Sequence, residues 1–184
     1  MMYSAQNSRQ LGFTLIEVLV TVLVLGIGLL GAAGMNARIL NGQFEAYQRA
    51  HAVLLVEDMA SRIRSSSREA RDGNYGGVTV GVIDQNCAGL SGVANDLCEW
   101  NQALRGASVV EAGQQLGSMI GARGCIENIS VPVAGQAVVR VTVAWQGLSS
   151  TVKSASTCGE NAYGADDNFR RTTSVDVTLA YLGI

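Results

Sequence analysis

The chain has 184 residues, of which 48% are hydrophobic and 15% are charged, and its formal net charge is −2. This length suits one domain with appended segments, and the apolar content is sufficient for a sizeable core. The weak negative charge provides no general attraction to nucleic acid, which excludes binding driven by overall charge.

The N-terminal part is a polar segment followed by an apolar one. Residues 1–12 are polar, with Arg9 as their only charged side chain, and residues 13–35 carry Glu17 as their only charge. A helix over residues 13–33 would be about 30 Å long, enough to cross the hydrocarbon core of a bilayer. The positive flank predicts a cytoplasmic N-terminus, and an ionisable group within such a segment is a functional candidate.

An ordinary secretory signal is the alternative for this region, because Gly31-Ala32-Ala33 has the small residues of a cleavage site. Glu17 interrupts the apolar region, however, and the helical pattern continues through the supposed cut. We therefore favour a membrane-spanning helix that stays in the protein.

The sequence from Leu11 to Val20, LGFTLIEVLV, resembles the type IV prepilin signature, and the continuation from Leu25 to Gly31 is similar to the PilV type of minor pilin. The resemblance implies that a prepilin peptidase removes residues 1–12 by cleaving between Gly12 and Phe13. It also implies that the same enzyme methylates the new amino group of Phe13.

Cleavage at this position gives Glu17 a physical purpose. The new α-amino cation of Phe13 and the carboxylate of Glu17 lie four residues apart, on the same helical face. Two opposite charges in a poorly solvated place cost less as a pair than each does alone. The resemblance implies that Glu17 meets the amine of a neighbouring subunit during filament assembly, whereas a Glu that reaches water at the membrane boundary is the simpler interpretation.

Four glycines crowd the end of the apolar segment, at positions 26, 28, 31 and 34. Small residues let helices approach closely in lipid, which indicates packing against partner helices. A second interpretation is a weak point, since Gly in a helix costs about 1 kcal/mol relative to Ala in water. Major pilins have a helix-breaking Pro near the position of Gly34, so we also expect residues 26–34 to unwind on assembly.

Residues 36–71 continue the helix as an amphipathic segment that should project from the membrane and then lie against a globular domain. The expected apolar stripe comprises Leu40, Phe44, Tyr47, Leu54, Leu55, Met59 and Ile63. His51 falls on this stripe and is interpreted as a packed histidine. The cations Arg62, Arg64, Arg68 and Arg71 gather near the helix end, where they complement its dipole; a DNA-binding patch is the less favoured interpretation.

A turn-rich sequence at 72–77 marks the start of the globular domain, residues 72–184. Alternation predicts strands at 124–130, 138–145 and 173–181, with a short strand at 78–80. A helix is predicted over 95–104, capped by Asn95 or Asp96, with Trp100 as a core anchor. One long helix packed on an antiparallel sheet is an α+β architecture and agrees with the type IV pilin fold that the resemblance implies.

The four cysteines, Cys87, Cys98, Cys125 and Cys158, all follow the apolar helix. They form no Cys-x-x-Cys pair, and the single histidine is far away in the sequence, so disulfides in an oxidising compartment are favoured over a zinc site. Three pairings are possible. We prefer Cys87 with Cys98 and Cys125 with Cys158, because each pair closes a local loop.

The remaining sequence provides no candidate for catalysis. It has no histidine-based triad and no phosphate-binding glycine loop, so we expect no enzyme activity, no cofactor and no metal. The acidic, Gly-rich loop at 154–171 does not have the ligand spacing of an EF-hand, so a solvated loop is favoured over a calcium site.

The resemblance therefore implies a minor pilin that helps to start type IV pilus assembly, supports twitching motility and adhesion, and sits at or near the pilus tip. Its implied location is the inner membrane, with a single span and a periplasmic domain, and then the pilus. Implied partners are other minor pilins, the major pilin, a tip adhesin, the prepilin peptidase and the inner-membrane assembly platform. A type II secretion pseudopilin is the main alternative, although its closest counterpart usually has a smaller globular part.

Overall fold

The computed structural model describes residues 12–106, 110–111, 114–115, 119–129 and 136–180. The leader expected at 1–12 lies outside these residues except for Gly12. The chain forms two units, residues 1–42 and 43–184. Helix α1 (Leu15–Ser65) contributes to both of them.

The first unit consists, in its described part, of residues 12–14 and of α1 as far as Gly42. Every described side chain in it is exposed. The glycines at 26, 28, 31 and 34 are helical, and a Cβ added at any of them would meet nothing within 4 Å. Within the part of the chain that the structure describes, no contact therefore requires small residues here. Both interpretations of these glycines, packing against partner helices and unwinding on assembly, remain predictions.

The second unit contains a four-stranded antiparallel sheet in the order β1-β4-β5-β6. Its strands are β1 (Val78–Val80), β4 (Arg123–Ile129), β5 (Gln136–Gln146) and β6 (Arg170–Ala180). The described parts also include α2 (Ser67–Arg71), α3 (Gly92–Arg105) and a small hairpin of β2 (Val110–Glu111) and β3 (Gln114–Gln115). The predicted strands and the antiparallel sheet are confirmed, with β4 to β6 a few residues longer or shorter than expected.

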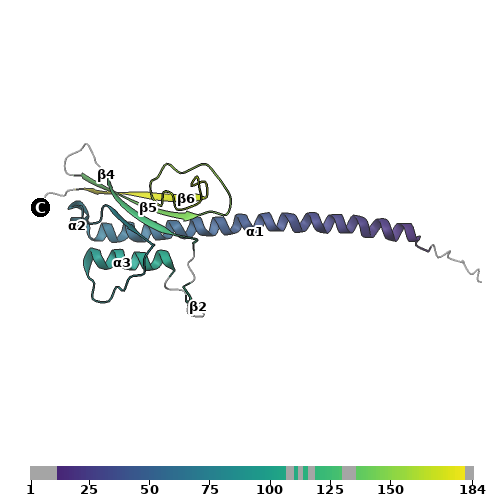
Figure 1. Ribbon diagram of the computed structural model, residues 1–184, viewed down its shortest axis with the longest axis horizontal. Helices are drawn as coiled ribbons and strands as arrows, with labels where there is room; N and C mark the ends of the chain where they lie inside the picture. The colour runs from purple at the N-terminus through teal and green to yellow at the C-terminus, as the bar shows by residue number, and fades with distance from the viewer. Residues whose placement is uncertain (1–11, 107–109, 112–113, 116–118, 130–135, 181–184) are drawn as a thin grey trace, which may run out of the picture. The chain divides into compact units, whose positions relative to one another are not determined.

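The second part of α1 and the whole of α3 lie side by side over the inner face of this sheet (Figure 1). The inner face presents alternate residues of each strand, including the registered row Ile126, Val141 and Val175. Trp100 of α3 is fully buried, and its indole N–H donates to the carbonyl of Leu55 in α1 at 2.9 Å. The expected role of Trp100 as a core anchor is confirmed.

The close approach of α3 to the sheet depends on Gly124 in β4. A Cβ at this position would overlap the ring of Trp100 and the side chain of Leu104. The helix ends at Arg105, and the next residue, Gly106, adopts the left-handed conformation with a φ of 71° and donates its backbone N–H to the carbonyls of Ala103 and Gln102. Glycine is thus needed at these two positions, once for space and once for backbone conformation.

Helix α3 begins earlier than predicted, at Gly92 after Ser91, so the expected cap at Asn95 or Asp96 is wrong. The reason is that both side chains are used elsewhere. Asp96 accepts a hydrogen bond from the Tyr75 hydroxyl, and Asn95 donates to Glu99 one turn later.

The predicted apolar stripe of α1 is only partly correct. Leu55, Met59 and Ile63 are buried, but Tyr47 and Leu54 are 57% and 67% exposed. The buried stripe instead comprises Gln48, Ala52, Leu55, Val56, Met59, Ala60 and Ile63, which recur at spacings of three and four. We attribute the difference to the small Ala52 and Ala60, which allow the sheet and α3 to approach the helix closely. His51 is half-buried, as expected of a packed residue.

Gln48 is the exception in this stripe, because its side chain is fully buried and, among the described residues, neither its amide nitrogen nor its oxygen has a hydrogen-bond partner. A buried amide without partners costs about 1–3 kcal/mol. Gln48→Met keeps the length of the side chain and a similar helix propensity while removing this cost. We expect an increase of about 1–2 kcal/mol in the free energy of unfolding, measured by urea denaturation of the full chain in detergent.

Gln43→Met is the matched control, because Gln43 is exposed on the same helix. It should change the stability by only a few tenths of a kcal/mol. A loss of stability in Gln48→Met would show that the buried amide makes a favourable interaction.

Candidate functional site

The start of α1 forms the first candidate site. Gly12 and Phe13 precede the helix and are exposed, with Phe13 at 84%. Thr14 occupies the N-cap position: its carbonyl accepts the N–H of Glu17 at 3.1 Å and that of Val18 at 3.3 Å. Its hydroxyl oxygen lies 3.4 Å from the same Glu17 nitrogen. The peptide bond between Gly12 and Phe13 is therefore accessible and lies outside the regular helix.

Thr14 and Glu17 have the spacing of a capping box, in which a Thr at the N-cap is followed three residues later by Glu. Glu17 also lies in the first helical turn, where a carboxylate complements the positive end of the helix dipole. Our sequence interpretation assigned Glu17 a role in assembly and missed this local one. The Thr-x-x-Glu spacing was the signal that could have revealed it.

The helix that follows is long and apolar enough to cross a membrane, as judged by length and composition. None of its most apolar stretch is buried within the protein. An apolar surface of this kind requires a lipid or protein environment to cover it.

The basic residues near the end of α1 do not form an isolated patch of positive charge. Arg62 contacts the carboxylates of Glu99, Asp58 and Asp96, with N–O distances of 2.6, 3.1 and 3.5 Å. Arg64 lies 3.6 Å from Glu57. Nucleic-acid phosphates would therefore have to compete with carboxylates already in contact with Arg62, so the geometry offers the DNA-binding hypothesis no support.

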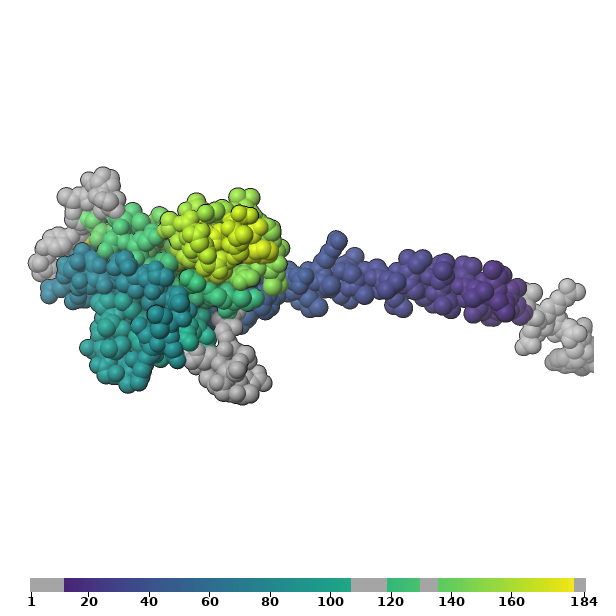
Figure 2. Space-filling model, in the orientation of Figure 1, coloured from purple at the N-terminus to yellow at the C-terminus, as the bar shows by residue number. Residues whose placement is uncertain are grey.

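The loop between β5 and β6 differs from the solvated loop that we predicted, because several of its side chains are buried. This loop, residues 147–169, and the start of β6 together form a lobe, which is coloured yellow-green in Figure 2. A disulfide joins Cys158 in this loop to Cys125 in β4, and a second joins Cys87 to Cys98 of α3. The preferred pairing of the cysteines is thus confirmed, and the first of these bonds attaches the lobe to the outer face of the sheet.

Asp167 and Arg170 form a buried ion pair at the base of this lobe, with an N–O distance of 3.6 Å. Arg170 also donates to the carbonyls of Ser156 and Cys158, at 2.6 and 2.9 Å. Asp167, one of the acidic residues of this loop, thus neutralises an arginine. Among the residues that the structure describes, no group of three or more His, Cys, Asp or Glu side chains could hold a metal ion.

Tyr163 is a buried residue of the lobe that bonds to the backbone outside it. Its hydroxyl donates to the carbonyl of Gly121 at 2.7 Å and lies 3.2 Å from that of Ala144. Burial raises the pKa of Tyr163 to about 12, so it remains a neutral donor at physiological pH.

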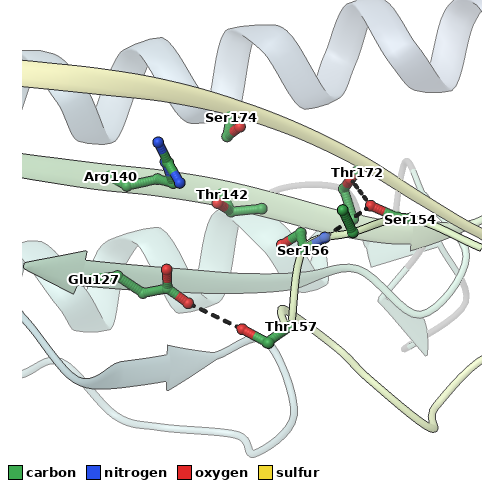
Figure 3. A pocket seen from close by; sticks show the side chains of 9 residues that line it. Glu127, Arg140, Thr142, Ser154, Ser156, Thr157, Thr172 and Ser174 are labelled. Carbon is green, nitrogen blue, oxygen red and sulfur yellow. Dashed lines mark hydrogen bonds between the residues drawn. The ribbon is translucent and has the colours of Figure 1, made fainter. Parts of the chain in front are cut away.

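A polar pocket of about 400 Å³ lies between the lobe and the outer face of the sheet (Figure 3). Its lining includes six hydroxyl side chains, those of Thr142, Ser154, Ser156, Thr157, Thr172 and Ser174, together with Glu127 and Arg140. Several of these groups already bond to each other: Ser154 to Thr172 at 2.7 Å, and Thr157 to Glu127 at 3.2 Å. The described lining therefore offers a set of hydrogen-bond donors and acceptors, with one carboxylate and one guanidinium among them.

Together, the long apolar helix and the antiparallel sheet packed on its continuation define the α+β fold of type IV pilins. Residues 7–33 match the family model described as "Prokaryotic N-terminal methylation motif". This match supports a prepilin-like protein, a type IV pilin or pseudopilin, which is a structural class of subunit anchored in the membrane before assembly. Neither a curated protein nor a solved structure matches the chain.

Asp167 should make the stability of the lobe depend on pH. Hydrogen bonds from the backbone N–H groups of Asn161 and Tyr163, together with Arg170, hold the pKa of Asp167 below its ordinary value of 3.8. A carboxyl with a lowered folded-state pKa stabilises the fold above the unfolded pKa, and this contribution disappears as the pH falls through the folded pKa. We expect the urea midpoint of the full chain to fall below about pH 4.

The variant Asp167→Asn should be less stable at neutral pH and should lose less stability on acidification. Asp166→Asn is the matched control, since Asp166 is an exposed neighbour and should keep the pH profile of the parent. Identical acid profiles for the parent and Asp167→Asn would contradict this role.

Proposed function

We propose that this protein is a minor pilin that helps to initiate type IV pilus assembly and takes its place at or near the pilus tip. The observation that carries the proposal is the methylation motif at residues 7–33, placed at the start of an exposed apolar helix. Supporting it are the accessible Gly12–Phe13 bond and Glu17 in the first turn. The likeness of the segment from Leu25 to Gly31 to PilV-type proteins supports the choice of a minor pilin.

In this mechanism the prepilin peptidase cleaves after Gly12 and methylates Phe13. The apolar half of α1 holds the subunit in the inner membrane, with the sheet domain in the periplasm, until it enters a filament. Burial of this helix among those of other pilins would then supply the association energy, at about 25 cal/mol per Å² of apolar surface. Glu17 would select the register by pairing with the amine of a neighbouring subunit.

The partners in this proposal are the other minor pilins, the major pilin, a tip adhesin and the inner-membrane assembly platform. A type II secretion pseudopilin is the second candidate, because the methylation motif at residues 7–33 supports either kind of subunit. Deletion in the native host separates them: loss of twitching motility with normal secretion supports the minor pilin, and the reverse supports the pseudopilin.

Processing is tested by expressing the full chain with and without a prepilin peptidase and measuring the mass of the membrane-bound product. With the peptidase, we expect residues 1–12 to be lost and Phe13 to carry an N-methyl group. Without it, residues 1–12 should be retained. A product that begins near Gly34 would identify an ordinary secretory signal, and Phe13 still joined to Gly12 in the presence of the peptidase would contradict the proposal.

The role of the Glu17 charge is tested with Glu17→Gln, which keeps the backbone N–H that Thr14 caps and removes only the carboxylate. We expect normal cleavage but about a tenfold loss of incorporation into pili, since an unpaired amine in a poorly solvated site costs at least 1.4 kcal/mol. Incorporation is measured by immunoblotting of sheared pili.

Thr14→Ala is the matched control, because it removes the capping hydroxyl and leaves Glu17 in place. Its incorporation should stay near that of the parent. If Thr14→Ala loses as much incorporation as Glu17→Gln, assembly depends on the structure of the helix start and not on the charge. If Glu17→Gln is incorporated normally, charge pairing plays no part in assembly.

A further inference from the structure

Strand β6 forms one edge of the four-stranded sheet. It spans 11 residues, Arg170–Ala180, whereas the strand at the opposite edge, β1, spans three, Val78–Val80. An edge strand presents a row of unpaired N–H and C=O groups to which another extended chain can bond.

The hydrogen bonds around β6 show which of its backbone groups point away from the sheet. Gly147 donates to the carbonyl of Phe169 at 2.8 Å, and the register continues through the pair Val141 and Val175. Hydrogen-bonded pairs recur at every second residue of an antiparallel ladder. The backbone groups of Thr173, Val175 and Val177 therefore bond to β5.

The residues between them, Ser174, Asp176 and Thr178, point their backbone groups to the free edge. The two ends of the strand agree with this alternation. Arg170 donates its N–H to the carbonyl of Asp167 at 3.0 Å, and the carbonyl of Ala180 accepts from Arg71 at 3.4 Å. Ser174, Asp176 and Thr178 are all exposed, and among the described residues no other segment bonds to their backbone groups.

The charges on the outer face specify what an added strand should carry. Glu127, Arg140 and Asp176 form one registered row across β4, β5 and β6, so the charges alternate from negative to positive to negative. Arg140 holds Asp176 through two bonds of 2.7 and 2.8 Å, yet the Asp176 side chain is still 44% exposed. A basic residue opposite Asp176 would continue the alternation, since opposite charges in facing positions stabilise a strand pair.

We infer that the free edge of β6 binds an extended strand of a partner protein that carries Arg or Lys opposite Asp176. The added strand runs antiparallel to β6 and bonds to the backbone groups of Ser174, Asp176 and Thr178. The side chains of the added strand that face the inner side of the sheet are apolar, because they lie beside Val175 and Val177 of β6.

The sequence of β5 provides a suitable probe. Arg140 lies opposite Glu127 in β4 with its backbone groups directed to that strand, since the bonds of β5 to β6 come from the alternate residues. A peptide copy of Gln136–Gln146 placed beyond β6 in the same direction would present its arginine to Asp176 in the same way that β5 presents it to Glu127.

The experiment measures binding of this synthetic peptide, labelled with a fluorophore at its N-terminus, to the full chain in detergent micelles by fluorescence anisotropy. We expect saturable binding. A second peptide with Arg140→Glu should bind about fivefold more weakly, because like charges then face each other across the strands. Asp176→Asn in the protein should remove this difference between the two peptides.

Ser174→Pro blocks the edge selectively, because it removes an N–H that points outward and leaves the bonds to β5 intact. It should abolish binding, whereas the matched variant Ser174→Ala should bind as the parent does. Thermal unfolding followed by circular dichroism checks that both variants fold. If Ser174→Pro does not fold, the inference is tested by the affinities of the two peptides for the parent and for Asp176→Asn.

Three outcomes would overturn the inference. The first is the absence of peptide binding, and the second is undiminished binding to a folded Ser174→Pro variant, which would indicate strand exchange or another site. The third is self-association of the full chain that Ser174→Pro abolishes, since the occupant would then be a second copy. None of these measurements depends on cleavage at Gly12, so they can fail while the proposed function stands.

Discussion

The packing of α1 against the inner face of the sheet is the constraint on which the second unit depends. Ala52 and Ala60 are fully buried in the stripe that faces the domain, and Trp100 joins α3 to the backbone of Leu55. The same helix carries large apolar side chains on its other faces, among them Tyr47 and Leu54. Its sequence therefore meets two requirements at once: a narrow buried stripe of mainly small and aliphatic residues, and an apolar exterior available to other molecules.

This double requirement explains which parts of the fold could be predicted from the sequence. The strands could be predicted where one face packs on the helices and the other faces solvent, as Val175 and the exposed Asp176 illustrate. Where the lobe covers the outer face, at Thr142 and Ala144, both faces are buried and the alternation is lost. The helix was harder to predict, since apolar residues on both the buried and exposed sides blur its periodicity. Leu54 and Leu55 cannot be distinguished by hydrophobicity, and only the surroundings decide which of them is buried.

Polar residues were the least predictable, because their roles depend on partners that are distant in the sequence. Asp96 suits a helix cap by local rules, yet it bonds to Tyr75 and Arg62. Asp167 occurs in an acidic, Gly-rich loop typical of solvent, yet it pairs with Arg170 beneath the lobe. The cysteine pairing was easier, because short loop closures left one arrangement favoured. At the N-terminus, the motif from Gly12 to Glu17 was recognisable because all of its residues are close together in the sequence.

The contact between Gly124 and Trp100 has a consequence for how relatives of this chain can diverge. Since any side chain at position 124 would overlap the indole ring, a larger residue there requires a change at position 100 or a shift of the helix. A homologue with a larger residue in this strand must carry a smaller one in the facing helix or shift that helix outward. Coordinated change at these two sites would thus identify descendants of this domain after most other sequence similarity has been lost.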